Sequence, residues 1–134
     1  MTKQVTIQPS GHQYQVIEGE TILTGAIDAG FNLPYGCRNG ACGACKGKVL
    51  EGAVDYGEYQ SSALTDAEKS DGLALFCCAT PLTDVLIECR EVSALNGIKP
   101  KILPVRVQMM EKLSHDVMAM FLKLPSNERM QFLA

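Results

Sequence analysis

Residues 35–45 read YGCRNGACGAC, and this stretch decides how the rest of the chain is interpreted. Eight of its eleven residues are Gly, Ala or Cys, and its apolar residues follow neither the period of a helix nor that of a strand. Such a composition is typical of a loop. From Pro34 to Lys46 we therefore predict an ordered loop that something other than apolar packing must hold in place.

Three cysteines of this loop and one distant cysteine have the spacing of a metal site. Cys37, Cys42 and Cys45 form C-x4-C-x2-C, and Cys77 follows after 31 intervening residues. This is the spacing of plant-type 2Fe-2S sites, whose ligands are cysteine thiolates. Small residues between the ligands let the backbone turn tightly and point its N–H groups at the sulfurs. The pattern therefore predicts one 2Fe-2S cluster held by these four cysteines.

Zinc is the main alternative, because four thiolates also suit a tetrahedral zinc ion. Zinc modules usually pair two short C-x2–4-C knuckles, whereas Cys77 has no such neighbour, so the spacing favours iron and sulfide. A redox pair made of Cys42 and Cys45 is disfavoured because no βαβ pattern surrounds them. A structural zinc module, or a binding-only domain with a vestigial site, stays open as the alternative function.

Two further cysteines and one arginine lie outside the predicted set of ligands. Cys78 directly follows Cys77 in a predicted strand, so we expect its side chain on the opposite face, away from the site. Cys78 and Cys89 are interpreted as buried thiols that act as small apolar residues. Arg38, inside the loop, can either offset the charge of a cluster or face solvent.

The segment before the loop predicts a hairpin and a helix. Residues 3–10 and 12–19 place apolar side chains at alternate positions on either side of a Pro-Ser-Gly turn, which favours a β-hairpin. Thr21 can cap a helix over residues 22–29, whose apolar residues share one face, and Gly30 can end it.

The segment after the loop completes an α+β pattern. A capping box at Thr65 predicts a short helix that stops at Gly72. Further strands are expected at about 47–54, 73–77 and 85–91. One main helix over a small sheet is typical of an α+β domain.

Composition and charge narrow the class of protein. Apolar residues make up 46% and charged residues 20% of the 134 residues, which fits a globular domain. Residues 1–98 carry 6 Lys/Arg and 12 Asp/Glu, whereas residues 99–134 carry 6 and 3. An acidic body argues against a nucleic-acid partner. We find neither a membrane span nor a signal peptide, so we expect a cytoplasmic protein whose cysteines are reduced.

Residues 35–45 and the later LFCCATP at 75–81 resemble the cluster motifs of plant-type 2Fe-2S ferredoxins. They are most similar to the ferredoxin domains of bacterial NAD(P)H-dependent iron–sulfur flavoprotein reductases, of the CDP-6-deoxy-Δ3,4-glucoseen reductase and oxygenase reductase component type. The resemblance covers about residues 3–92 and implies a β-grasp fold. In that family the fourth ligand lies four residues before a proline, which here is Pro81 and selects Cys77 over Cys78.

The tail resembles the first strands of the FAD-binding barrel that follows the ferredoxin in those reductases. The expected domains are a ferredoxin-type domain at 1–96, a linker at 97–104 and an incomplete FAD-binding domain at 105–134, with strands at about 102–111 and 117–124. The Arg-x-Tyr-Ser/Thr flavin motif is absent from the sequence, so FAD and NAD(P)H are expected only in a full-length reductase.

The resemblance implies one-electron transfer. A flavin reductase domain, in cis or in trans, would take electrons from NAD(P)H and pass them through the cluster to an acceptor enzyme. This stretch of chain would not oxidise NAD(P)H unaided.

Overall fold

The computed structural model describes residues 1–92 and 101–130 of the chain. The chain divides into two compact units, Met1–Ala94 and Leu95–Ala134, which are described separately below. Residues 97–100 of the linker predicted at 97–104 lie outside the described residues, and the three predicted domain boundaries stay a prediction.

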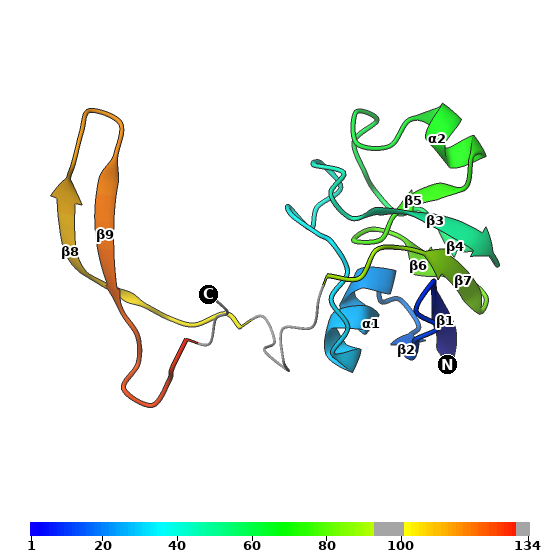
Figure 1. Ribbon diagram of the computed structural model, residues 1–134, viewed down its shortest axis with the longest axis horizontal. Helices are drawn as coiled ribbons and strands as arrows, with labels where there is room; N and C mark the ends of the chain where they lie inside the picture. The colour runs from blue at the N-terminus through cyan, green and yellow to red at the C-terminus, as the bar shows by residue number, and fades with distance from the viewer. Residues whose placement is uncertain (93–100, 131–134) are drawn as a thin grey trace. The chain divides into compact units, whose positions relative to one another are not determined.

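The first unit is built on a mixed five-stranded sheet (Figure 1). Its strand order is β2-β1-β7-β3-β5. The strands are β1 (Thr2–Gln8), β2 (Gln13–Ile17), β3 (Lys46–Glu51), β5 (Leu73–Leu75) and β7 (Val85–Glu88). β1 pairs antiparallel with β2 in the predicted hairpin and parallel with β7. This sheet with few helices confirms the predicted α+β class and its β-grasp architecture.

Helix α1 (Ile22–Ala29) covers the sheet and ends where its capping residues predict. The Thr21 hydroxyl accepts a hydrogen bond from the N–H of Thr24 at 3.2 Å, and Gly30 ends the helix at a φ of 87°. Gly25 faces β2 so closely that a Cβ there would lie 2.7 Å from Cγ2 of Val16. The buried core between helix and sheet consists mainly of Val5, Ile7, Tyr14, Val16, Ile22, Leu23, Ala26, Leu33, Phe76, Val85 and Ile87.

The predicted capping box is present in helix α2 (Asp66–Ser70). The Thr65 hydroxyl accepts from the N–H of Glu68 at 3.3 Å, while the Glu68 carboxylate accepts from the N–H of Thr65 at 2.9 Å. Gly72, expected as the stop, follows two residues after the helix ends, with a φ of 88°.

The prediction of a single strand over 47–54 is wrong, because the strand ends at Glu51 and the chain turns at Gly52. This residue has a φ of 93°, and a Cβ there would lie 2.3 Å from the carbonyl oxygen of Asp84. After this sharp turn, β4 (Val54–Asp55) pairs with β6 (Thr80–Pro81) in a separate two-stranded sheet. The strand predicted at 85–91 likewise ends early, at Glu88.

The strand predicted at 73–77 ends at Leu75, so Cys77 and Cys78 lie in a turn. The N–H groups of Cys78 and Ala79 both donate to the carbonyl oxygen of Leu75, at 3.0 and 2.8 Å. Because successive side chains alternate between faces only in a strand, the argument that put Cys78 opposite Cys77 does not apply here.

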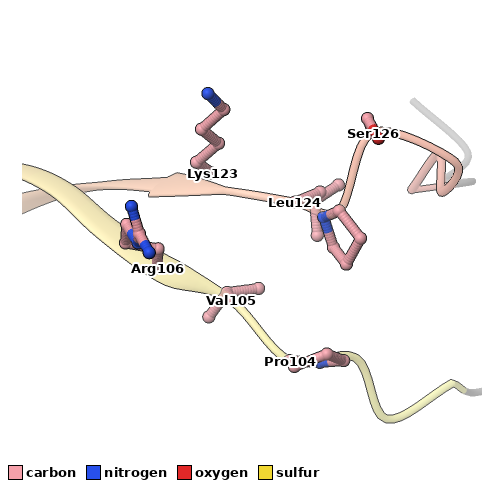
Figure 2. A pocket seen from close by; sticks show the side chains of 7 residues that line it. Pro104, Val105, Arg106, Lys123, Leu124 and Ser126 are labelled. Carbon is pink, nitrogen blue, oxygen red and sulfur yellow. The ribbon is translucent and has the colours of Figure 1, made fainter.

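The second unit contains an antiparallel hairpin of β8 (Arg106–Lys112) and β9 (Met118–Lys123) (Figure 1). Strands were predicted at both places. Most of its apolar side chains are exposed, because a two-stranded ribbon has no second layer to cover them. At its open end, Pro104, Val105, Arg106, Lys123, Leu124, Pro125 and Ser126 line a hollow of about 500 Å³ (Figure 2). None of the predicted ligands lines this hollow.

Within residues 1–92 and 101–130, no helix is long and apolar enough to cross a membrane.

Candidate metal centre

The loop that follows α1 directs backbone N–H groups at two cysteine sulfurs. The Sγ atom of Cys37 accepts from the N–H groups of Asn39, Ala41 and Cys42 at 3.4, 3.4 and 3.3 Å. The Sγ atom of Cys42 accepts from the N–H groups of Cys37 and Ala44, both at 3.4 Å. Donors aimed at sulfur stabilise negative charge there, which suits thiolate ligands.

These donors change the acidity of Cys37. The backbone N–H groups of Asn39, Ala41 and Cys42 lower the pKa of its thiol to about 6, from an ordinary value near 9. The thiolate is therefore the favoured form of this side chain at neutral pH. In contrast, burial raises the pKa of Cys45 to about 12. A metal that binds Cys45 must displace its proton.

The loop also brings Cys45 to the distant Cys77. The N–H of Cys77 donates to the Sγ atom of Cys45 at 3.5 Å, and the N–H of Phe76 donates to the carbonyl oxygen of Cys45 at 3.2 Å. The Cys45 side chain is only 3% exposed, whereas Cys37 and Cys42 are exposed. The structure thus pairs Cys37 with Cys42, which are exposed, and Cys45 with Cys77, which are buried and partly buried.

The first turn of α1 holds the turn that carries Cys77. The N–H groups of Ile22 and Leu23 donate to the carbonyl oxygens of Ala79 and Phe76, both at 2.9 Å. The first N–H groups of a helix have no hydrogen-bond acceptor within the helix, and here the carbonyl oxygens of the turn are their acceptors. The Phe76 ring is fully buried, and a Cβ on Gly47 would lie 2.3 Å from it. This packing fixes the turn from its inner side.

The donor set fits a binuclear cluster better than a single ion. Cys37 is linked to Cys42, and Cys45 to Cys77, by N–H to sulfur hydrogen bonds. A 2Fe-2S cluster has two irons, each with its own two protein ligands, whereas a tetrahedral zinc site needs four ligands around one point.

Arg38, for which the sequence left two alternative roles, is exposed. It adopts a φ of 59°, and its guanidinium lies 5.6 Å from the centroid of the exposed Tyr35 ring. Cys89 is buried at 8% exposure, as predicted, and its thiol donates to the carbonyl oxygen of Arg90 at 3.7 Å.

Cys78 is the residue that the sequence analysis placed wrongly. Its Sγ atom lies 3.5 Å from the Sγ atom of Cys77, so both sulfurs are on the same side of the turn. The Cys78 side chain is partly buried, and burial raises its pKa to about 12. The structure therefore puts a fifth cysteine beside Cys77, one of the four predicted ligands.

Comparisons with known proteins agree with this geometry. The profile of the family described as "2Fe-2S iron-sulfur cluster binding domain" matches residues 5–82. The reductase component DmpP of phenol 2-monooxygenase from Pseudomonas sp. (strain CF600) is 46% identical over 88 residues, which cover 66% of this chain and 25% of that protein. The CDP-6-deoxy-L-threo-D-glycero-4-hexulose-3-dehydrase reductase of Yersinia pestis is 30% identical over 134 residues, covering 100% of this chain and 40% of that protein.

A solved structure extends the similarity to the whole chain. The Amycolatopsis cytochrome P450 reductase GcoB matches with a TM-score of 0.68 and 29% identity, over 98% of this chain and 38% of that one. The chain thus spans between a quarter and two fifths of the length of these proteins.

Proposed function

This chain belongs to the 2Fe-2S iron-sulfur cluster binding domain family, and from this membership we propose that it relays single electrons through one cluster held by Cys37, Cys42, Cys45 and Cys77. The observation that supports the ligand assignment is that Cys37 is joined to Cys42, and Cys45 to Cys77, by N–H to sulfur hydrogen bonds. The free thiol of Cys89 is bonded elsewhere, to the carbonyl of Arg90.

A bound cluster supplies the electron-transfer chemistry, because one of its irons alternates between the ferric and ferrous states. The contribution of the chain is to hold the ligands and to set the energy of the reduced state. Backbone N–H groups from residues 37–44 surround the sulfurs of Cys37 and Cys42 and stabilise the added negative charge. Burial of Cys45 limits the access of water from the other side.

The exposed pair of ligands gives the direction from which electrons would enter and leave. Cys37 and Cys42 are exposed, and so are Tyr35, Arg38 and Asn39 beside them. A redox partner that docks on this face comes closer to the cluster than one that docks on the sheet. Acidic side chains at Glu51, Asp55 and Glu58 favour a basic partner surface.

We infer that the donor is a reduced flavin fed by NAD(P)H and that the electrons pass to an acceptor enzyme. The relatives named above are reductases or reductase components, and two of the matches run through the tail. In this proposal residues 105–134 begin a flavin-binding domain, and the exposed apolar side chains of β8 and β9 are covered by later parts of a longer protein.

The six cysteines are all free of disulfides, which supports a reducing, cytoplasmic location.

The experiment that tests the relay uses the purified chain with a chemical reductant. Anaerobic titration with dithionite should bleach the visible absorbance with one electron per chain and give one unpaired spin per chain by electron paramagnetic resonance. FAD should not bind stoichiometrically, and NADPH alone should not bleach the protein. Uptake of no electrons would contradict the relay, and tight FAD binding would contradict the assignment of the tail as an incomplete domain.

A further inference from the structure

Cys78 lies close enough to the predicted fourth ligand to act on it. Its Sγ atom is 3.5 Å from that of Cys77, within the range of a hydrogen bond between sulfur atoms. The Cys78 side chain also packs against the buried cluster of Cys45, Ala63, Leu64 and Leu75, which contains another proposed ligand. Cys78 therefore lies beside the proposed ligands as well as against apolar side chains.

Two glycines from separate segments make room for Cys78 at this place. A Cβ on Gly40, in the ligand loop, would lie 2.9 Å from the Cys78 sulfur. A Cβ on Gly57 would lie 2.5 Å from the Cys78 carbonyl oxygen and 3.4 Å from its Cβ. The N–H of Gln60 donates to the carbonyl oxygen of Gly40 at 2.9 Å and ties the two segments together. Close packing against backbone on both sides restricts where the thiol can point.

The direction of the sulfur–sulfur hydrogen bond follows from the chemistry of the ligand. A cysteine that binds iron does so as a thiolate, which carries no proton and can only accept. Resting on the proposed function, we propose that Cys78 is a positioning residue whose S–H donates to the sulfur of Cys77 and raises the reduction potential of the cluster. It is not itself a ligand.

The expected sign follows from electrostatics. Reduction adds one negative charge, which is shared with the ligand sulfurs, and hydrogen bonds to these sulfurs are among the groups that set the potential of iron–sulfur clusters. A donor at Cys77 stabilises the reduced state more than the oxidised state. Removal of this donor therefore shifts the midpoint potential to a more negative value.

Two variants of nearly equal side-chain volume isolate the donor. Cys78→Ala removes the S–H, whereas Cys78→Ser keeps a donor in a side chain of similar size. Cys89→Ala is the matched control, because Cys89 is also a buried thiol but bonds to the Arg90 carbonyl. For each protein, iron and sulfide are counted first, and the midpoint potential is then measured by spectroelectrochemical titration.

The inference predicts a full cluster in all four proteins, a more negative potential in Cys78→Ala, and potentials close to that of the parent in Cys78→Ser and Cys89→Ala. Loss of the cluster from Cys78→Ala alone would also support a donor, because Cys78→Ser differs from it chiefly by the hydroxyl. An unchanged potential in Cys78→Ala, or equal changes in the Ala and Ser variants, would overturn the inference. A parent protein without iron would instead overturn the proposed function.

Discussion

The backbone N–H of Leu23 donates a 2.9 Å hydrogen bond to the carbonyl oxygen of Phe76. Through this bond the start of helix α1 holds the residue that precedes Cys77, while the N–H of Phe76 donates to Cys45. Two of the proposed ligands are thus positioned by one buried residue. The stability of the fold and the geometry of the site are coupled at Phe76.

Replacement of Phe76 tests this coupling. The ring is fully buried, so Phe76→Ala should lower the free energy of unfolding by about 3–5 kcal/mol and speed the loss of the cluster. Leu82→Ala is the control, because Leu82 is 55% exposed and should change stability by less than about 0.5 kcal/mol. Urea denaturation and the decay of visible absorbance measure the two effects. Equal effects of the two substitutions would show that Phe76 does not hold the turn.

Cys77 and Cys78 should differ sharply in their importance for cluster assembly. The N–H of Cys77 bonds to Cys45, and Pro81 lies four residues after Cys77 as the family motif requires. Cys77→Ser should therefore lose most of its iron, whereas Cys78→Ser should keep it. Iron analysis of both purified variants is sufficient. Full iron in Cys77→Ser would show that Cys78 can replace the fourth ligand.

Gly40 is expected to be less replaceable than Gly43, the other glycine of the ligand loop with a positive φ. An alanine there would meet the Cys78 sulfur and the Glu58 carbonyl oxygen, each at 2.9 Å, so Gly40→Ala should prevent stable cluster binding. Gly19→Ala controls for backbone strain, since Gly19 has a φ of 89° with nothing within 4 Å of a Cβ. Both variants should lose some stability, and only Gly40→Ala should lose iron.

The ion pair of Lys46 and Glu68 should contribute to stability above mildly acidic pH. A 2.7 Å hydrogen bond from Lys46, followed by the Thr65 N–H, lowers the pKa of Glu68 to about 2 from 4.5. A depressed pKa in the folded state stabilises the fold above pH 4.5, and this contribution disappears as the pH falls toward 2. Glu68→Gln should therefore unfold more easily than the parent at pH 7, and the difference should shrink at pH 3. Thermal unfolding at both pH values measures it, and a constant difference would contradict the pairing.

Local signals in the sequence were sufficient where the structure depends on neighbouring residues. Thr21 and Gly30 bound α1 as predicted, since each cap bonds within a few residues of itself. The end of β3, just before Gly52, could also have been predicted from the sequence, because an isolated glycine in a strand pattern favours a bend. In the tail, β9 (Met118–Lys123) lies close to the strand predicted at 117–124, whereas β8 begins at Arg106, four residues after its predicted start.

The turn at Cys77 could not be predicted because distant residues create it. Residues 73–77 have an apolar pattern that suits a strand, but N–H groups of α1 bond to the carbonyl oxygens of Phe76 and Ala79, and the N–H of Phe76 bonds to the carbonyl oxygen of Cys45. The position of Cys78 depends in addition on Gly40 and Gly57, which are not adjacent to it in sequence. The ligand spacing identified the kind of site, whereas the neighbours of the ligands required the fold.

The central claim is that Cys37, Cys42, Cys45 and Cys77 hold one 2Fe-2S cluster. The most direct measurement is the metal and sulfide content of the anaerobically purified chain, together with its visible spectrum. The account predicts a red-brown protein with about two irons and two sulfides per chain. A colourless protein with one zinc ion per chain would contradict it.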